Sequence, residues 1–460
     1  MDIIKLYYHL PYPLKVIAAS FKGYELRSLR YSTETERLVE EALKRDYWSE
    51  KQWNKWREER LAFILHRAAT QVPYYRNHWQ ERRKNGDKAA WDLLQNWPIL
   101  DKETLRRQPL AFVAEDCDIH KMYPDHTSGT TGTPLHIWLN RSTIQKWYAI
   151  FEARIRRWYD VSWKNSWGIF GGQTVVPINQ NKPPYWVRNF GLNQTYFSVL
   201  HISPSTYQFY IEEIIKRKLT HLITYTNSLY YIACGVPKSQ QPIKSELRVI
   251  FTNAEPLYDF QRKKIEEVFG CPVKETYGLA EMVCQATECE NGHMHWWPEA
   301  GRHEIVNEAG EQVNIGETGR LISTGLSNPD MPLIRYDTKD LATRHTSDVP
   351  CECGRKLPLA GNFIGRQDDV ILTRDGRKLT QLDTIFDPNS PLKEAQIVQN
   401  TLDDFVIRVV PDTGWSHKDA NYLVKELQKH VGNVNVQVKE EKQIERTWAG
   451  KFRIIVSKLK

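Results

Sequence analysis

The chain has 460 residues, 41% of them apolar and 26% charged, and is therefore long enough for two or three domains with a substantial core. Its net charge of +7 arises from 63 basic and 56 acidic residues that are interspersed along the chain, which disfavours nucleic acid as a partner. No stretch approaches the roughly 18 uninterrupted apolar residues of a membrane-spanning helix, and the seven cysteines accompany no export signal, so we expect a cytoplasmic protein without a transmembrane segment or a disulfide framework.

Residues 1–120 form the first predicted region, a helical leader of a larger domain. The region is rich in Arg, Lys, Glu and Trp, and apolar residues recur every three or four positions over 33–43 and again over 53–69. This spacing predicts an amphipathic helix over each range.

Residues 121–365 form the predicted core of the larger domain. Short β-branched runs alternate there with amphipathic helices, which is typical of a mostly parallel sheet with crossover helices. In one such unit Ser205 is the expected cap of a helix, which leads into a strand over 219–225 and a short helix over 228–234.

The next unit brings two polar segments to one edge of the predicted sheet. A strand over 247–252, a helix over 257–269 and a strand over 273–277 follow one another. The loops that leave the carboxyl ends of such strands are where an open α/β sheet holds its ligands. Segments 252–256 and 277–281 lie at those ends, so we expect a binding site there.

Residues 366–460 form a separate small α+β domain, the predicted lid. A hairpin is expected around Asp375-Gly376, followed by a strand over 405–410, a helix over 418–431 and a strand over 434–438. The predicted fold class is therefore α/β, with a large N-terminal domain of mostly parallel sheets and a small C-terminal lid.

A loop rich in hydroxyl groups runs from Thr127 to Pro134 and reads Thr-Ser-Gly-Thr-Thr-Gly-Thr-Pro. Such a loop can turn its amide hydrogens and hydroxyls toward one point, as a bound polyphosphate requires; an ordinary polar turn is the alternative. It differs from the P-loop of kinases and ATPases, which ends in Gly-Lys-Ser or Gly-Lys-Thr where this chain has Gly132-Thr133-Pro134.

This loop resembles the signature of the adenylate-forming superfamily, and most of the chain is similar to the phenylacetate-CoA ligase branch, including its capsule-biosynthesis relatives. Leader segments 72–76 and 97–102 are also similar to the helical prologue of that branch. The resemblance implies a catalytic role for Thr130 and assigns ATP binding to Ser128, Gly129, Thr130, Thr131, Gly132 and Thr133. Many superfamily loops carry Lys in place of Thr133, a departure that affects one pyrophosphate contact.

The two segments at the strand ends also match family motifs. By resemblance, Ala254-Glu255-Pro256 forms one wall of the adenine pocket, and in Tyr277-Gly278-Leu279-Ala280-Glu281 the tyrosine stacks on adenine while Glu281 helps to hold magnesium. A tyrosine face stacks readily on a purine, and a hard cation prefers carboxylate oxygen. Taken alone, the first segment reads as a strand-to-helix connection and Glu281 as a solvated helix cap.

Two further motifs concern the ribose and the hinge. The segment from Arg335 to Asp340 resembles the motif whose final aspartate accepts both ribose hydroxyls, so Asp340 is the expected ribose ligand. The segment Gly365–Asp369 resembles the family hinge, in which Arg366 contacts the nucleotide and Asp368 is the pivot of the lid.

The tail segment 446–453 is similar to the motif that delivers the adenylation lysine, here Lys451. A lysine brought in by a closing lid can stabilise the negative charge that develops as a carboxylate attacks the α-phosphorus. The alternative is one more solvated lysine in a tail that also has Lys458 and Lys460. Five motifs in family order favour the catalytic interpretation.

Cys289, His295, Cys351 and Cys353 form a candidate zinc site. Thiolates and imidazole suit tetrahedral zinc, and relatives in the same branch carry a structural metal. Cys284 and His293 compete as ligands, and buried free thiols are the alternative. A closed site of four protein ligands would have no direct catalytic role.

The motifs together predict an enzyme that uses ATP and Mg²⁺ to convert a carboxylic acid into an acyl-adenylate. CoA is the expected acyl acceptor, an amine such as an amino sugar or amino acid is second, and loading of a carrier protein is a third option. Residues 167–173 and 201–203 are expected to border the acyl pocket. Lys451 argues against a scaffold without chemistry. The family branch suggests polysaccharide biosynthesis, and the oligomeric state stays open, a dimer included.

Overall fold

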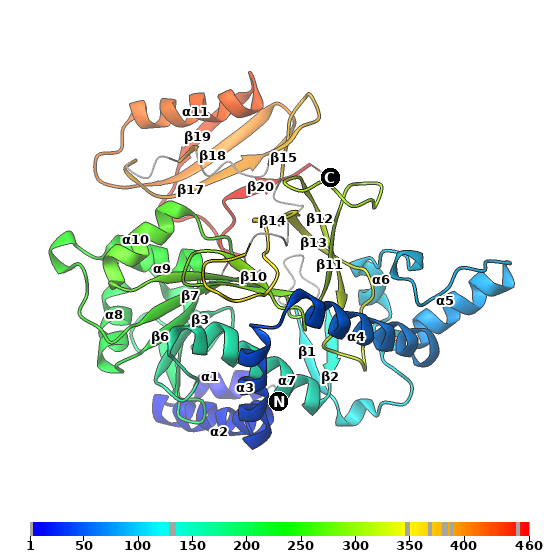
Figure 1. Cartoon of the computed structure of the whole chain (residues 1–460). Coiled ribbons are helices and arrows are strands. Elements are labelled where there is room, and N and C mark those ends of the chain that lie inside the picture. The colour runs from blue at the N-terminus through cyan, green and yellow to red at the C-terminus, as the bar shows by residue number, and fades with distance from the viewer. Residues whose placement is uncertain are drawn as a thin grey trace.

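The computed structural model describes residues 3–127, 135–203, 205–345, 350–366, 370–379, 385–386, 390–447 and 451–459. Figure 1 shows a large body with a small C-terminal lid above it. The described helices include none with the length and apolar character needed to cross a membrane. The predicted domain boundaries after residues 120 and 365 stay predictions.

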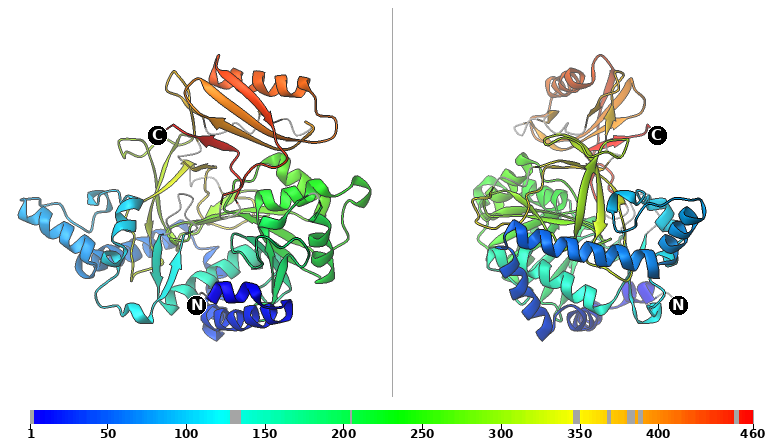
Figure 2. Two further views of the ribbon diagram at one scale, coloured as in Figure 1. Left: turned by 180° about the vertical axis from the view of Figure 1, so that it is seen from behind. Right: turned by 45° about the vertical axis from the view of Figure 1, so that its right-hand side comes forward.

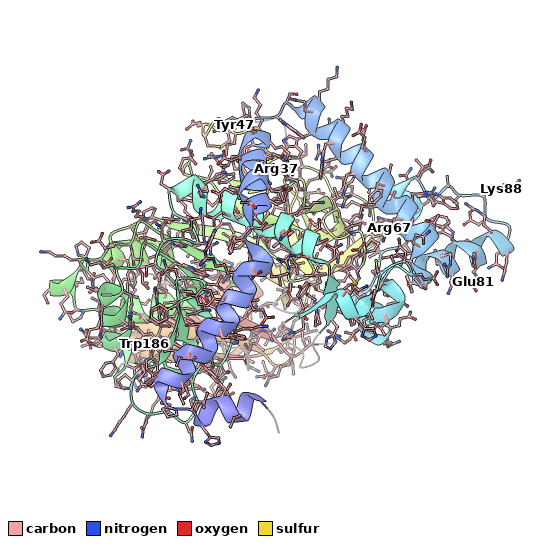
Figure 3. The ribbon with its side chains drawn as sticks, turned by 90° about the horizontal axis from the view of Figure 1, so that it is seen from below. Arg37, Tyr47, Arg67, Glu81, Lys88 and Trp186 are labelled. Atoms are coloured by element: carbon pink, nitrogen blue, oxygen red, sulfur yellow. The ribbon has the colours of Figure 1, made fainter. Side chains whose placement is uncertain are left out.

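The leader is helical, as predicted, and its helices lie on the outside of the large body (Figures 1 and 3). The helices over 33–43 and 53–69 are confirmed, and each is longer than predicted. Both begin at a serine that forms a capping box, Ser32 with Thr35 and Ser49 with Gln52. The α-helices of the leader are α1 (Ile3–His9), α2 (Tyr12–Arg30), α3 (Thr33–Arg45), α4 (Glu50–Gln71), α5 (Pro73–Lys84) and α6 (Lys102–Arg107).

The core of the large body is built on a mixed sheet with the order β10-β9-β8-β7-β6-β3-β5-β4. The middle strands β8, β7, β6, β3 and β5 run parallel, as expected, and antiparallel strands stand at both edges. The strands are β3 (Trp167–Gly171), β4 (Trp186–Asn189), β5 (Gln194–Ser198), β6 (His221–Tyr225), β7 (Val249–Asn253), β8 (Val273–Gly278), β9 (Gln285–Glu288) and β10 (Met294–Trp296).

Crossover helices connect the parallel strands and confirm both predicted units. The crossover helices are α8 (Tyr207–Lys216), α9 (Thr226–Gly235) and α10 (Asp259–Phe269), and α7 (Arg141–Phe151) precedes β3. Leu222, Ile250 and Ile265 are fully buried between this sheet and its helices. The predicted cap at Ser205 is wrong: α8 begins after Thr206, and no side chain caps its first turn, because Thr206 Oγ1 donates instead to the carbonyls of His201 and Ser203.

Residues 301–366 differ from the expected parallel pattern. They form an antiparallel sheet in the order β11-β12-β13-β14. The turn between β11 and β12 includes Gly310 and Gly316, both with positive φ, and is too short for the crossover helix that parallel strands need. The strands are β11 (Gly301–Val306), β12 (Thr318–Gly325), β13 (Tyr336–Thr343) and β14 (Phe363–Arg366). A separate hairpin pairs β1 (Tyr123–His126) with β2 (His136–Leu139).

The lid is an α+β domain with the sheet order β19-β18-β17-β20 and helix α11 on one face (Figures 1 and 2). Ile397, Ile407 and Leu427 form its buried core. The predicted hairpin, two strands and helix are confirmed, whereas β17 and β20 were not predicted. The elements are β15 (Ile371–Leu372), β16 (Lys378–Leu379), β17 (Leu392–Gln399), β18 (Asp404–Pro411), α11 (His417–Val431), β19 (Asn435–Glu440) and β20 (Ile455–Ser457).

Candidate functional site

Two predicted motifs meet at one edge of the main sheet. Ala254-Glu255-Pro256 directly follows β7, and Tyr277 and Gly278 end the neighbouring parallel strand β8. Ala254 has a φ of 63°, a left-handed conformation that costs free energy in a residue with a side chain and is often found where a binding site constrains the backbone. This edge is the expected ligand edge of the sheet.

The Glu255 carboxylate joins the large domain to the C-terminal tail. Its Oε1 accepts a hydrogen bond of 2.8 Å from the backbone N–H of Phe452, and its Oε2 accepts bonds of 2.9 and 3.0 Å from the backbone and side-chain N–H groups of Asn227. Burial raises the pKa of Glu255, although these hydrogen bonds and the nearby Lys451 charge oppose that shift. The carboxylate therefore holds the tail at the residue next to Lys451.

Lys451 reaches the same edge of the sheet. Its Nζ lies 5.6 Å from the centroid of the Tyr225 ring, and Tyr225 is the last residue of β6. The Tyr225 hydroxyl accepts a hydrogen bond of 2.9 Å from the N–H of Gly172. The tail is further tied by a 3.0 Å hydrogen bond from the Lys451 N–H to Thr447 Oγ1. The structure thus brings the predicted catalytic lysine to the strand ends that carry the nucleotide motifs.

Tyr277 and Asp340 are also together. The Tyr277 hydroxyl donates a hydrogen bond of 2.7 Å to Asp340 Oδ2, and burial together with the Asp340 charge raises the pKa of Tyr277 well above its ordinary value. One face of the tyrosine ring is stacked on Phe363, with ring centroids 3.8 Å apart. Stacking of Tyr277 on adenine, which stays a prediction, would use the face turned away from Phe363.

Glu281 is almost fully buried and already has two partners. Its Oε1 accepts hydrogen bonds of 3.0 Å from Lys102 Nζ and 2.7 Å from the Tyr336 hydroxyl. Neither contact uses Oε2. Because Mg²⁺ keeps several waters and needs only one or two carboxylate oxygens, this carboxylate fits the predicted magnesium ligand through Oε2.

Several predicted site residues cannot be placed. Those outside the described residues are Ser128, Gly129, Thr130, Thr131, Gly132, Thr133 and the hinge residue Asp368. Arg366 lies in β14, where its backbone pairs with Asp340 across the sheet. Ahead of the loop, the N–H of Thr127 donates to the carbonyl of Leu135 at 3.0 Å, and this pair closes the β1–β2 hairpin.

The sequence interpretation gave no role to Lys102, Asn227, Tyr225 or Tyr336, which contact the predicted residues. Three of them had a signal in the sequence. Tyr225 ends the predicted strand over 219–225, at the ligand edge of the sheet, Lys102 ends the leader segment 97–102, and Tyr336 lies in the motif from Arg335 to Asp340. Asn227 acts through a tertiary contact that no local pattern reveals.

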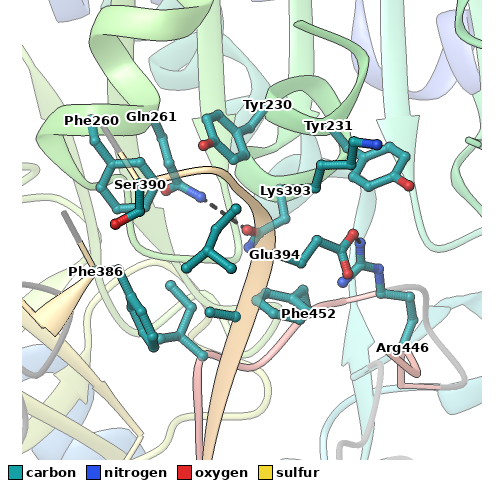
Figure 4. Close-up of a pocket in the computed structure, with 14 residues that line it drawn as sticks. Tyr230, Tyr231, Phe260, Gln261, Phe386, Ser390, Lys393, Glu394, Arg446 and Phe452 are labelled. Carbon is teal, nitrogen blue, oxygen red and sulfur yellow. Dashed lines mark hydrogen bonds and ion pairs between the residues drawn. The ribbon is translucent and has the colours of Figure 1, made fainter. Parts of the chain in front are cut away.

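The tail and lid rest on α9 and α10 along a small cavity of about 60 Å³ (Figure 4). Tyr230 and Tyr231 of α9 face Glu394 of β17, which forms an ion pair with Arg446 of the tail. Burial raises the pKa of Glu394, and Arg446 opposes that shift. Phe452 also lines this cavity. The hydrogen bond between Glu255 and the Phe452 backbone is therefore next to the contact between the lid and helices α9 and α10.

The four predicted metal ligands form one cluster. The ligand atoms of Cys289, His295, Cys351 and Cys353 lie within 4.8 Å of one another, with 3.7 Å between the sulfurs of Cys289 and Cys351 and 3.5 Å between Cys353 Sγ and His295 Nε2. Sulfurs bound to tetrahedral zinc at about 2.3 Å lie roughly 3.8 Å apart, so this geometry fits zinc. His295 Nδ1 lies 3.1 Å from the carbonyl of Leu357, a contact that leaves Nε2 free to bind a metal.

The two competing ligands fall in different places. Cys284 is absent from the cluster and lies near Tyr277 and Asp340, where burial and the Asp340 charge raise the pKa of its thiol. His293 Nδ1 is 3.4 Å from Cys351 Sγ, beside the cluster. Burial lowers the pKa of His295 to about 4, which keeps its ring neutral.

Comparisons with known proteins agree with this architecture. The family model of the CapK C-terminal domain matches residues 371–458. The chain is 24% identical to the protein CapK of Staphylococcus aureus over 84% of this chain and 85% of that protein. It is 25% identical to the phenylacetate-coenzyme A ligase of Aromatoleum evansii over 87% of this chain and 93% of that enzyme.

Among solved structures, a 2-hydroxyisobutyryl-CoA ligase in its postadenylation state, in complex with R3-HIB-AMP, matches with a TM-score of 0.70 and 20% identity over 90% of this chain and 91% of that chain. The same enzyme in an open conformation, with 2-HIB-AMP and CoA, gives a TM-score of 0.53 and 19% identity over 88% and 90% of the two chains. The fold is therefore that of the adenylate-forming CoA ligases.

Proposed function

Because this chain is a homologue of CapK and of the phenylacetate-CoA ligases and has the fold of adenylate-forming CoA ligases, we propose that it is an AMP-forming acid ligase. The enzyme uses ATP to activate a carboxylic acid as an acyl-adenylate and then transfers the acyl group, with CoA as the preferred acceptor.

One observation carries this proposal: Glu255 of the Ala-Glu-Pro turn binds the backbone of Phe452 at 2.8 Å and so fixes the tail beside Lys451. A lysine side chain has many rotamers, and holding its backbone reduces the entropy lost when it reaches a reacting phosphate. A scaffold that only binds nucleotide would not need a cation supplied from a second domain.

In the proposed first step, a carboxylate oxygen of the substrate attacks the α-phosphorus of ATP. The bond between that phosphorus and the oxygen bridging to the β-phosphate breaks, and pyrophosphate leaves with the electron pair. Lys451 stabilises the charge that develops on the phosphoryl oxygens. Asp340 accepts the ribose hydroxyls, and Tyr277 supports the adenine.

The remaining predicted residues complete the site in the same proposal. The loop from Ser128 to Thr133 binds the phosphates with its amide and hydroxyl hydrogens, and Arg366 and Asp368 act at the hinge. Glu281 would hold Mg²⁺, and the ion would offset the negative charge of the phosphates. Lys102 and Tyr336 orient the Glu281 carboxylate.

Zinc in the Cys289, His295, Cys351 and Cys353 cluster is a further part of the proposal. Its support is the donor set and the short distances between the ligand atoms. The cluster connects the β9–β10 hairpin to the segment that precedes β14, so a bound ion would cross-link these parts of the large domain. With four protein ligands the ion would act on stability and not on the reaction.

The acceptor and setting are also proposed. CoA fits the relatives named phenylacetate-coenzyme A ligase, whereas an amine or a carrier protein is the alternative acceptor. A cytoplasmic location suits an enzyme that consumes ATP and CoA and whose seven cysteines form no disulfide bond in the structure. Polysaccharide biosynthesis, a dimeric state and an acyl pocket at residues 167–173 and 201–203 stay predictions.

Exchange of labelled pyrophosphate into ATP, measured with a panel of carboxylic acids, tests the proposal. We expect acid-dependent exchange that requires Mg²⁺, followed by product formation when CoA is supplied. Omitting CoA and supplying amines then identifies the acceptor. Absence of exchange with every acid, in protein that is folded and binds ATP, would contradict the proposed first step.

A further inference from the structure

A groove of about 510 Å³ lies on the face of the lid sheet that is turned away from α11. Volumes of roughly 300–1,000 Å³ are typical of ligand sites. Side chains alternate along a strand, so Ile407 faces the helix while its neighbour Arg408 faces the groove. The groove crosses all four strands of this sheet, from Lys439 of β19 to Val456 of β20, and reaches Lys451 in the tail.

The groove is strongly basic. Its lining includes the six cations Arg408, Lys439, Arg446, Lys451, Arg453 and Lys458, against the two carboxylates Glu441 and Glu445. Arg408 Nε donates to Glu441 Oε1 at 2.7 Å and Arg446 forms an ion pair with Glu394, so two of the six cations have a carboxylate partner and the lining keeps a net positive charge. A solvated sheet face usually mixes both signs of charge, whereas a hollow lined by one sign attracts counter-ions. The expected ligand is therefore an anion with several charges.

Lysines stand at both rims. Lys439 belongs to β19 and Lys458 directly follows β20, and these are the two edge strands of the lid sheet. Both side chains are exposed, and within the described part of the chain neither has a carboxylate partner. Arg408 lies between them on the floor. This spread suits a ligand with more than one phosphate group, since each group can meet a separate cation.

We propose that this groove binds phosphate groups of a reactant, an inference that rests on the proposed function of the site beside it. The groove ends at Lys451, where the pyrophosphate of the first step is set free. The same cations could instead hold the phosphate groups of an acyl acceptor such as CoA. In both cases the group bound is a phosphate anion, and the cations of the groove would not favour binding of an uncharged acceptor.

The test compares two full-length double variants with the same change in net charge. Lys439→Glu/Lys458→Glu reverses the rims of the groove, and Lys418→Glu/Lys425→Glu reverses two exposed lysines of α11 on the opposite face. Calorimetry measures binding of inorganic pyrophosphate and of CoA to each protein. Kinetics then give the KM for pyrophosphate in exchange, and for CoA and pantetheine in acyl transfer; pantetheine has the same thiol without the nucleotide phosphates.

We expect the groove variant to bind at least one phosphate ligand about tenfold more weakly, with the α11 variant unchanged, because two attractive charges become repulsive. A higher KM for pyrophosphate identifies the released product as the ligand. A higher KM for CoA with an unchanged KM for pantetheine identifies the acceptor. Equal affinities in both variants and the wild type, or no binding of either ligand to the wild type, would contradict the proposal that the groove binds phosphate groups.

Failure of the proposed function would look different. A wild type that lacks pyrophosphate exchange would refute the acid ligase, yet the two calorimetric titrations would still decide whether the groove binds phosphate. Weaker binding in the groove variant would support the groove in that case as well, and equal binding would overturn it.

Discussion

The Cys/His cluster and the tail junction are both assembled from distant parts of the chain, but they are built differently. The cluster brings four ligand atoms within 4.8 Å of one another, all from the predicted large domain. The junction joins that domain to the lid tail through the hydrogen bond between Glu255 and the Phe452 backbone. The cluster is a closed site within one domain, whereas the junction depends on the position of the lid relative to the large domain.

This difference separates stability from chemistry. Four ligands around one point leave no position for a substrate, so the cluster can stabilise the domain without taking part in a reaction. The junction depends on the hydrogen bond from the tail to Glu255 and lies next to a cavity, as expected for an interface that opens and closes during turnover. Variants of the two centres should therefore change different measured quantities.

The largest effect is expected for Lys451→Ala. Removing the cation that stabilises the transition state should lower pyrophosphate exchange about 10²–10³-fold. ATP binding and the unfolding midpoint should stay close to the wild-type values, because Phe452 and its hydrogen bond to Glu255 remain. Steady-state exchange, calorimetry with ATP and thermal unfolding check the three parts, and exchange at the wild-type rate would contradict the assignment.

Loss of the metal cluster should act on stability instead. Cys351→Ser should abolish stoichiometric zinc and lower the unfolding midpoint by about 5 °C or more, because a free energy of 1 kcal/mol corresponds to roughly 2–4 °C in a large domain. Elemental analysis of protein purified without chelator and thermal unfolding measure both. Cys271→Ser, at a buried free thiol outside the cluster, is the matched control and should keep its zinc.

Zinc at one equivalent in the Cys351→Ser protein, or no zinc in the wild type, would contradict the metal assignment. Exchange per folded molecule should change less than threefold below the unfolding transition. A loss of exchange as large as that of Lys451→Ala, in folded protein, would remove the distinction between the two centres.

Glu255→Gln should give a smaller effect at the junction. The amide keeps the size of the side chain but has a single acceptor oxygen, so either the Phe452 N–H or the Asn227 N–H groups lose their acceptor and the remaining bond is neutral. The maximal rate of exchange should therefore fall about tenfold. The KM for ATP should change less than twofold if Glu255 positions Lys451 and does not bind the nucleotide. A rise in KM at an unchanged maximal rate would mean that Glu255 acts on ATP directly.

The smallest effect is expected for Tyr277→Phe. The ring keeps its stacking on Phe363, and only the hydroxyl that donates to Asp340 is lost. The dissociation constant of ATP should rise about threefold, because Asp340, the expected ribose ligand, loses a hydrogen bond that orients its carboxylate. Calorimetric titration with ATP measures it, and Tyr277→Ala, which also removes the ring, should weaken binding further. Equal affinities of the two variants would argue against stacking on adenine.

Much of the fold was predictable because its signals are local. The strand predicted over 273–277 is β8, and the helix predicted over 418–431 is α11 with one more residue. β17 and β20 were not predicted, because β17 reads Leu-Lys-Glu-Ala-Gln-Ile-Val-Gln without strict alternation of apolar and polar residues, and β20 has only three residues. The antiparallel sheet from Gly301 to Arg366 differed from expectation because the sequence of a strand does not determine whether it pairs parallel or antiparallel with its neighbour.

The candidate site was predictable as a set of motifs but not as a set of contacts. The four cluster residues were identified from their chemistry. The structure places His293 beside the cluster and Cys284 away from it. The contact of Glu255 with Phe452 joins residues 197 positions apart, and the ion pair of Lys102 with Glu281 spans 179. Such pairs form only through tertiary packing, which no single-sequence pattern specifies.

The most direct test follows the oxygen that forms the adenylate. A carboxylic acid that supports exchange is labelled with ¹⁸O in its carboxylate, converted with ATP and acceptor, and the AMP is analysed by mass spectrometry. Attack of the carboxylate on the α-phosphorus leaves one labelled oxygen in each AMP after the acyl group is transferred. AMP with one ¹⁸O is the predicted result, whereas unlabelled AMP, or ADP in its place, would contradict acyl-adenylate formation by this chain.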